Sequence, residues 1–334
     1  MPHVPKIPVW LDCDPGHDDA LAIILAGHSP LIELLGLSTV AGNQTVDKVT
    51  ENAYRILYAA GLPGVEVVQG QGRPLLRPPL VCGEIHGESG LDAGPHNPRQ
   101  TRGAPQAWRS WPPAWRRPSR RRRPGEPRVR VVATGALTNV ALLLTLHPEL
   151  IPALEVVFMG GALGTGNTAP VAEFNIQVDP EAAHIVTSCG VHTSMVPLEV
   201  THTALVTEAV AEAVLGGPLA PRDSASPFRK TMYDLLHFFQ STYKEVFGFD
   251  NPPLHDPCAV AYVIAPELFK VSFLRVDVET RSDLSAGQTV TDLRKTTGRA
   301  PNTHVCLAMD VEGFWALMLS SLATADASSP LNQS

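Results

Sequence analysis

Four carboxylates fall within eight residues near the start of the chain, in the run Asp12-Cys13-Asp14-Pro15-Gly16-His17-Asp18-Asp19. The run follows the apolar segment 7–11, which is typical of a buried strand, and precedes the apolar segment 20–26, which is typical of a helix. Carboxylates this close raise each other's pKa unless a cation or solvent relieves their repulsion. The alternative is an acidic helix N-terminus, where Asp18 and Asp19 would complement the helix dipole. Because capping accounts for two of the four, the sequence favours a site for a hard divalent cation.

Strand-like and helix-like segments alternate along most of the chain. Strands are expected at 9–12, 32–41, 65–69, 129–134, 154–159, 193–197 and 269–278, and helices at 18–26, 47–60, 137–147, 180–188, 207–215, 224–247 and 256–265. This alternation is typical of an α/β fold with a mostly parallel sheet. We therefore expect a single domain over residues 5–320, built as a Rossmann-like open sheet with helices on both faces. Residues 321–334 are expected to form a C-terminal tail.

Polar residues follow the ends of several expected strands. Asn43 follows the second strand, Thr134 the fourth, Gly160-Gly161 the fifth, and Glu199 and Thr201 the sixth. The carboxyl ends of the strands of a doubly wound sheet lie along one edge, where such proteins bind ligands. The acidic run follows the first strand and belongs to the same edge. The sequence thus predicts one site to which distant segments contribute.

Three further polar segments are candidates for this site. They are the glycine-bracketed loop 86–92, which begins with His86, the run 167–175, which contains Asn167, Glu173 and Asn175, and the pair His255-Asp256 before an apolar helix. Asn and Glu side chains suit a polyhydroxylated ligand, because they offer donors and acceptors to several hydroxyls. Ordinary loop polarity is the alternative for the Asn and Glu residues. For Asp256, the alternative is that it caps the N-terminus of the following helix. For His255, the alternative is that it is a loop histidine without a functional role.

Together these segments resemble the nucleoside hydrolase family, the calcium-dependent ribohydrolases that prefer inosine and uridine. The resemblance rests on an ordered set of motifs: the acidic run through Ala20, Val40-Ala41-Gly42-Asn43, Ile85-His86-Gly87-Glu88-Ser89-Gly90, Ala133-Thr134-Gly135-Ala136-Leu137-Thr138-Asn139, Met159-Gly160-Gly161, Ala172-Glu173-Phe174-Asn175, Asp179-Pro180-Glu181-Ala182-Ala183 and His255-Asp256. The order and spacing match over nearly the whole chain. The resemblance implies the nucleoside hydrolase fold and hydrolysis of the N-glycosidic bond of ribonucleosides to ribose and free base.

The resemblance also implies a ligand set for Ca²⁺, formed by Asp14, Asp19, Asp256 and the backbone carbonyl of Thr134. Calcium prefers six to eight oxygen ligands of this kind. Asp14 would also take the proton from the attacking water, whose pKa the cation lowers. Asp12 would orient these ligands from behind them.

Substrate contacts are implied in the same way. Asp18, Asn43, Asn167, Glu173 and Asn175 would bind ribose hydroxyls, Met159 would pack against the sugar, and His86 would lie in a mobile loop over the site. The departing base leaves better once protonated, and His255, with a reference pKa near 6.5, is the expected donor at neutral pH. Tyr243 is placed like a residue that contacts the base, with a core-facing aromatic as the alternative.

Composition bounds the class of protein and its surroundings. The chain has 334 residues, of which 44% are hydrophobic, and a net charge of −7. It contains neither an apolar run of 18 residues nor a charged-then-apolar leader, so we expect no membrane insertion and no secretion. Its five cysteines are scattered and predict neither a disulfide framework nor a metal site. We therefore expect a cytoplasmic enzyme that acts on a small nucleoside, without a nucleic-acid partner, and the resemblance implies a homodimer or homotetramer.

The stretch 95–130 departs from the family pattern. It contains Arg116-Arg117, the run Arg120-Arg121-Arg122-Arg123, many prolines and three of the five tryptophans. Interleaved Arg and Trp are one feature of RNA-binding arms. However, the segment has no helical or strand period, and this density of Pro and Arg disfavours a packed element. We favour an irregular surface loop or a product of a shifted reading frame over a nucleic-acid function.

Two other functions are compatible with part of the pattern. Phosphatases of the haloacid dehalogenase type also place paired aspartates after a first strand, but here Pro15-Gly16 follows Asp14 and no later lysine and acidic pair suits phosphate and Mg²⁺. A catalytically weak or inactive nucleoside-binding homologue is the second alternative. The filled ligand and acid positions argue against it.

Overall fold

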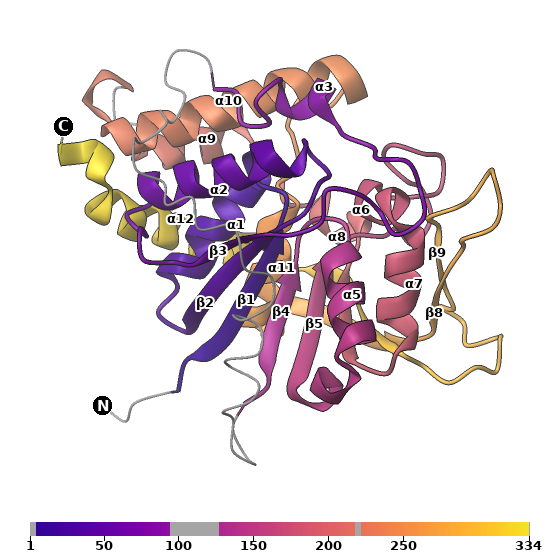
Figure 1. The fold of residues 1–334 in the computed structure, drawn as a ribbon. Helices are drawn as coiled ribbons and strands as arrows, with labels where there is room; N and C mark the ends of the chain where they lie inside the picture. Colours follow the sequence, from indigo (N-terminus) through magenta and orange to yellow (C-terminus); the bar gives the residue numbers. More distant parts are fainter. Residues whose placement is uncertain (1–4, 94–126, 218–221, 334) are drawn as a thin grey trace.

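The computed structural model describes residues 5–93, 127–217 and 222–333. A sheet with strand order β3-β2-β1-β4-β5-β6-β10-β7 forms its centre (Figure 1). These strands are β1 (Ile7–Cys13), β2 (Ile32–Thr39), β3 (Val67–Gln69), β4 (Val129–Ala133), β5 (Leu154–Met159), β6 (His192–Val196), β10 (Thr303–Met309) and β7 (Phe269–Leu274). All neighbouring strands are parallel except β10 and β7, which are antiparallel. The predicted α/β architecture is confirmed.

Side chains of the central strands alternate between the two faces of the sheet, as strand geometry requires. Val9 and Leu11 pack into one hydrophobic core, whereas Trp10 between them packs into the other. The first core lies under α1 (His17–His28), α2 (Val46–Ala59), α11 (Asp256–Ile264) and α12 (Val311–Ser328), and the second under α5 (Thr138–Leu146) and α7 (Pro180–Ser188). Helices therefore cover both faces of the sheet (Figure 1).

Shorter elements and one long helix complete the fold. They are α3 (Gly83–His86), α6 (Phe174–Val178), α8 (Leu198–Thr201), α9 (Glu208–Leu215), the long helix α10 (Pro227–Phe247), and the two-stranded ribbon of β8 (Val276–Val278) and β9 (Thr289–Thr291). Short 3-10 turns lie at Pro148–Ala153, Arg222–Ser224, Pro266–Leu268 and Pro330–Gln333. In Figure 1, α10 lies across the upper end of the molecule, beside α3.

The strand order reverses between β1 and β4. From β1 the chain proceeds outward to β2 and β3 on one side, and from β4 outward to β5 and β6 on the other. Open α/β sheets bind ligands at such a switch point, beyond the carboxyl ends of the strands. Asp12 of β1 pairs with Ala133 of β4, so the acidic run after β1 and Thr134 after β4 lie next to each other there.

The C-terminal part of the chain was predicted least well. Neither β10 nor α12 was expected from the sequence, and residues 321–334 were expected to form a tail. The boundary at 321 is wrong, because α12 continues to Ser328 and buries Leu322 and Ala325 in the core. The expected strand 269–278 is also wrong as one element: β7 stops at Leu274, and β8 leaves the main sheet to pair with β9. Most of the stretch 95–130 lies outside the described residues, and its last two residues begin β4.

Candidate active site

The acidic run forms a tight turn between β1 and α1. The backbone N–H of Gly16 donates to Oδ2 of Asp19 at 3.0 Å, which caps the start of α1. Asn43 ties the turn to the end of β2, since its backbone N–H donates to Oδ2 of Asp14 at 2.7 Å and its side-chain amide donates to Oδ2 of Asp19 at 3.0 Å. A Cβ on Gly135 would lie 2.6 Å from Oδ1 of Asp14, so the glycine after Thr134 leaves room for this carboxylate. Residues that follow β1, β2 and β4 therefore meet at this turn.

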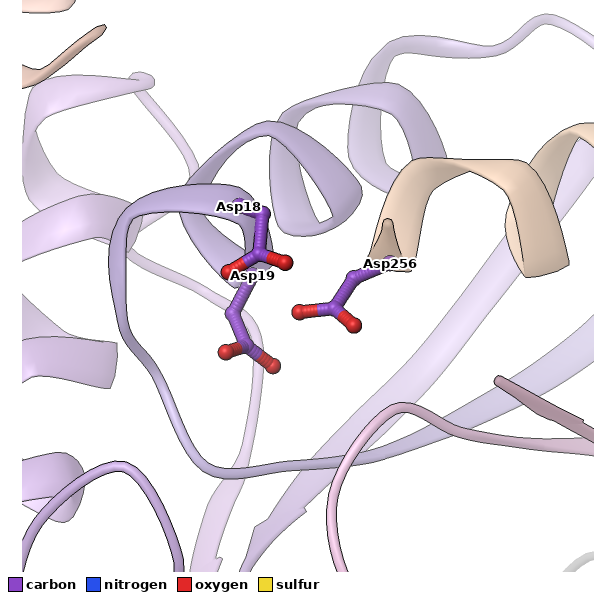
Figure 2. A group of neighbouring side chains, drawn as sticks. All are labelled: Asp18, Asp19 and Asp256. Atoms are coloured by element: carbon purple, nitrogen blue, oxygen red, sulfur yellow. The ribbon is translucent and has the colours of Figure 1, made fainter. Parts of the chain in front are cut away.

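Three carboxylates converge at the N-termini of two helices. Ligand oxygens of Asp18 and Asp19, from α1, and of Asp256, from α11, lie within 4.8 Å of one another, and all three residues are buried. Figure 2 shows the Asp256 carboxylate pointing toward the two α1 carboxylates. Asp14, which was expected as a ligand, is not a member of this group of three. Its Oδ1 is nevertheless buried and, in the part of the chain that the structure describes, has no hydrogen-bond partner.

The four acids are electrostatically unfavourable as carboxylates. Burial, followed by the charge of Asp19, raises the pKa of Asp14 well above its usual range. Burial and the charge of Asp19 also raise the pKa of Asp18 to about 7. Burial, with Asp18 and Asp19 next, raises the pKa of Asp256 well above its usual range. An oxygen-binding cation among these groups would reverse the shifts, because it favours the ionised form of each acid. The donor set and the unpaired Oδ1 of Asp14 fit a hard divalent cation.

One oxygen of the Asp12 carboxylate is bound by side chains from β2 and α5. Oδ1 of Asp12 accepts hydrogen bonds from the Ser38 hydroxyl and, at 2.8 Å, from the side-chain amide of Asn139. Its backbone carbonyl accepts the N–H of Thr134 at 2.8 Å. The Thr134 hydroxyl in turn donates to Oδ1 of Asp19 at 2.8 Å. Asp12 therefore supports the loop that presents Thr134 to the acidic group.

A cavity opens beside the acidic group. All the residues that the sequence analysis expected to bind substrate line it: Asp18, Asn43, His86, Met159, Asn167, Glu173, Asn175 and Tyr243. Thr134, His255 and Asp256 line it as well, whereas Asp14 and Asp19 are buried just outside the lining. The structure thus brings segments from eight parts of the sequence to one cavity.

One wall of the cavity is polar and preorganised. The Glu173 carboxylate accepts the backbone N–H groups of Gly161, Asn175 and Ile176 at 2.9, 2.8 and 3.2 Å. Burial nevertheless raises the pKa of Glu173 to about 7. The side-chain amide of Asn175 donates to the Thr134 carbonyl at 2.8 Å. This wall can offer both donors and acceptors to neighbouring hydroxyls of a ligand.

Another part of the cavity wall carries a histidine held at both ring nitrogens. Nδ1 of His255 lies 2.8 Å from the Thr201 hydroxyl oxygen, and Nε2 lies 2.9 Å from the Tyr243 hydroxyl oxygen. Burial, followed by the effect of His202, lowers the pKa of His255 to about 3. The expectation of an ordinary imidazole pKa near 6.5 is therefore wrong for this state, because the buried ring is neutral at pH 7. Tyr243 lines the cavity and also packs on Phe239 and Phe247, so both interpretations of it describe part of its surroundings.

His86 closes the same wall from α3. Its Nδ1 lies 3.2 Å from Nδ1 of His17, and the His17 Nε2 lies 2.8 Å from the carbonyl oxygen of Asp92. Because a carbonyl only accepts, His17 carries its proton on Nε2 when neutral. Burial lowers the pKa of His17 to about 4, so this ring is neutral at pH 7.

Comparison with known proteins identifies the chain. Residues 9–316 match the family model described as inosine-uridine preferring nucleoside hydrolase. The chain belongs to this family. A probable ribonucleoside hydrolase of Dictyostelium discoideum is 45% identical over 95% of this chain and 94% of its own length. The pyrimidine-specific ribonucleoside hydrolase RihA of Klebsiella pneumoniae is 42% identical over 95% of this chain and 98% of its own.

Solved structures of nucleoside hydrolases share the fold. The purine-preferring ribonucleoside hydrolase from Gardnerella vaginalis superposes with a TM-score of 0.82 at 27% identity, covering 96% of this chain and 99% of its own. A plant nucleoside hydrolase gives a TM-score of 0.81 at 27% identity, covering 95% and 99%. The predicted family and fold are confirmed, and the chain is a hydrolase of N-glycosidic bonds in nucleosides. The phosphatase alternative is excluded by the same match.

In this nucleoside hydrolase, several cavity residues were missed by the sequence analysis. Cys82, Ile85, Thr168, Phe174, Phe239 and Phe247 also line the cavity. Phe239 and Phe247 lie four residues before and after Tyr243 on α10, a spacing that places all three on one face of a helix. The sequence therefore contained a signal that could have identified these two residues.

None of the helices among the described residues is long and apolar enough to cross a bilayer.

Proposed function

We propose that this nucleoside hydrolase depends on Ca²⁺ and releases ribose from ribonucleosides. The observation that carries the proposal is the buried group of Asp18, Asp19 and Asp256, with the unpaired Oδ1 of Asp14 beside it, at the base of the cavity. Asp14, Asp19, Asp256 and the carbonyl of Thr134 would hold the ion. When bound, it supplies positive charge that ionises these acids and lowers the pKa of a neighbouring water. Oxygen-only ligands favour calcium or another hard cation over softer metals.

Asp14 is the proposed general base. Its Oδ2 accepts the Asn43 N–H, so this oxygen is fixed, whereas Oδ1 is free to accept the proton of an attacking water. The bound cation would keep Asp14 ionised at neutral pH, the state that a general base requires. Both oxygens thus have distinct tasks.

Ribose recognition is assigned to the polar wall. Asp18, Asn43, Asn167, Glu173 and Asn175 would bind the hydroxyls of the sugar, and Met159 would pack against it. Oε2 of Glu173 already accepts two backbone N–H groups and Oε1 accepts one, so a lone pair of Oε1 remains for a ligand hydroxyl. The existing bonds therefore orient the carboxylate without exhausting it, which favours a rigid ribose site.

His255 is the proposed donor to the departing base. Its ring lines the cavity next to Tyr243. Cleavage of the N-glycosidic bond leaves negative charge on the base nitrogen as positive charge develops on the sugar. The base takes the bonding electrons, and a proton from Nε2 of His255 would neutralise it. Because the free ring is neutral at pH 7, Nε2 must first take up a proton from solvent, and burial then makes the protonated ring a strong acid. Tyr243 and His86 would contact the base beside it.

The loss of activity caused by replacing His255 should depend strongly on the leaving group of the substrate. We expect His255→Ala to lower kcat for uridine about 10²-fold or more, the usual contribution of a general acid. Hydrolysis of p-nitrophenyl riboside should fall less than about tenfold, because p-nitrophenolate leaves without protonation. Steady-state kinetics on both substrates measure the difference. Equal losses on the two substrates would remove His255 from this role.

A reducing-sugar assay over a panel of nucleosides tests the function itself. We expect ribose from uridine, cytidine, inosine and adenosine at different rates, and no inorganic phosphate from a panel of phosphate esters used as controls. The relatives at 42% identity are named pyrimidine-specific, whereas the purine-preferring structure is 27% identical, so we propose that pyrimidine ribonucleosides react fastest. Absence of ribose from every nucleoside in the presence of Ca²⁺ would overturn the proposal.

We also propose a cytoplasmic homodimer or homotetramer. All five cysteines are free in the structure, as expected for a reducing compartment. The oligomeric state is proposed from the family resemblance, and sedimentation measures it.

A further inference from the structure

The hydroxyl of Thr201 is buried directly behind the proposed proton donor. Thr201 is the last residue of α8 and is 0% exposed. It does not line the cavity, so it does not touch the substrate. Its Oγ1 lies 2.8 Å from Nδ1 of His255 and 3.4 Å from the carbonyl oxygen of Leu198. The hydroxyl therefore lies between a ring nitrogen and a group that can only accept.

These contacts favour one direction for the hydrogen bonds. The Leu198 carbonyl accepts the Thr201 hydroxyl proton, so Oγ1 of Thr201 is free to accept from Nδ1–H of His255. With the proton on Nδ1, Nε2 of the neutral ring accepts from the Tyr243 hydroxyl, 2.9 Å away. The chain of donors thus runs from Tyr243 through His255 and Thr201 to a backbone carbonyl. Every group in it is satisfied.

We propose that Thr201 is a positioning residue that fixes the tautomer and orientation of His255. By holding Nδ1–H, Thr201 leaves Nε2 as the nitrogen that exchanges its proton on the side of Tyr243 and the cavity. Before bond cleavage, Nε2 takes up a proton from solvent, which makes the ring an imidazolium. When the N-glycosidic bond breaks, its electrons pass to the base nitrogen, the Nε2 proton moves to that nitrogen, and the ring returns to the Nδ1–H tautomer held by Thr201. This inference rests on the proposed role of His255.

The surroundings of the ring explain why a hydroxyl is needed there. His255 is buried, and its other ring contacts, with His202 at 5.5 Å and Tyr243 at 6.1 Å between ring centroids, orient the plane of the ring but not its tautomer. Without the Thr201 hydroxyl, Nδ1 would be a buried donor with no acceptor in place. The ring would then favour a proton on Nε2, or turn to find another acceptor for Nδ1–H.

A pair of substitutions separates the hydroxyl from the shape of the side chain. Thr201→Val keeps the shape and removes the hydroxyl, whereas Thr201→Ser keeps the hydroxyl and removes a methyl group. We expect Thr201→Val to lower kcat for uridine about 10- to 100-fold, the usual effect of removing a group that orients a functional histidine. The rate on p-nitrophenyl riboside should change less than about threefold, and Thr201→Ser should restore most of the rate on uridine.

The outcomes distinguish this inference from the proposed function. A wild-type enzyme that releases no ribose contradicts the proposed function, whatever the variants do. An active wild type with an unchanged Thr201→Val variant, or with equal losses on both substrates, contradicts the role of Thr201 alone. Should Thr201→Val fail to fold, ¹⁵N-histidine NMR of the wild type decides, with His255→Ala used to assign the signal. We expect the proton of neutral His255 on Nδ1, and a proton on Nε2 would overturn the inference.

Discussion

Asp14→Asn should abolish turnover while leaving the metal-free protein folded. An amide at this position can still accept the Asn43 N–H through one oxygen, but it places an NH₂ group where the unpaired Oδ1 of Asp14 lies. The substitution therefore removes the general base and a cation ligand together. We expect kcat for uridine to fall about 10³-fold or more, within the range of lost general-base catalysis plus a lost ligand. Stopped and continuous ribose assays measure the loss.

Whereas turnover should fall in Asp14→Asn, the thermal stability of the metal-free variant should not. Because burial and Asp19 raise the pKa of Asp14, the neutral amide relieves a cost that the ionised acid carries in the metal-free protein. We expect the unfolding temperature of metal-free Asp14→Asn to equal or exceed that of the wild type, with a smaller rise on addition of Ca²⁺. Asp250→Asn is the matched control, since this exposed acid pairs only with Lys244 among the contacts described and should change neither quantity. Retained turnover in Asp14→Asn would contradict the role of Asp14.

Removal of divalent cations should lower stability, and more so as the pH rises. Burial raises the pKa of Asp18 and of Glu173 to about 7 in the metal-free folded protein, above the values of these acids in the unfolded chain. The folded state then binds more protons than the unfolded state between about pH 4 and 7, so its stability falls with rising pH across that range. The contribution is fully present below the unfolded pKa values and is lost as the pH passes the folded ones.

Calcium should reverse this trend. It binds the ionised acids, so its stabilising effect grows with pH and reaches about 4 kcal/mol at a thousandfold excess over its Kd. Thermal unfolding from pH 4.5 to 8, with dialysed protein and with added Ca²⁺, measures both curves. We expect them to lie together at low pH and to diverge toward pH 8. Parallel curves, separated by the same amount at every pH, would show that the cation does not bind these acids.

Short-range sequence patterns predicted most of the fold and many residues of the candidate site. The acidic run between an apolar strand and an apolar helix identified β1 and α1 within a few residues, because both elements and the turn between them are contiguous in sequence. Helix α12 was missed although Phe314, Met318, Leu322 and Ala325, its buried residues, recur at helical spacing, and Asp310 caps it. That signal was present and could have been used.

Other features depend on tertiary contacts that no local pattern contains. In the sheet, β10 lies between β6 and β7, although all three strands are far apart in the sequence. The pairing of Thr201 with His255 joins residues 54 positions apart, and the burial that lowers the pKa of His255 arises only when α8, α10 and α11 pack together. Residue types at the strand ends predicted which side chains meet. Their hydrogen-bond partners and protonation states required the assembled structure.

Ribose release from uridine during a titration of Ca²⁺ into metal-free wild-type protein tests the central claim most directly. If Asp14, Asp19 and Asp256 hold an ion that turnover requires, the rate rises from near zero and saturates, and a chelator returns it to the starting value. A metal-free protein that already hydrolyses uridine at the full rate, with no response to the ion, would contradict the account.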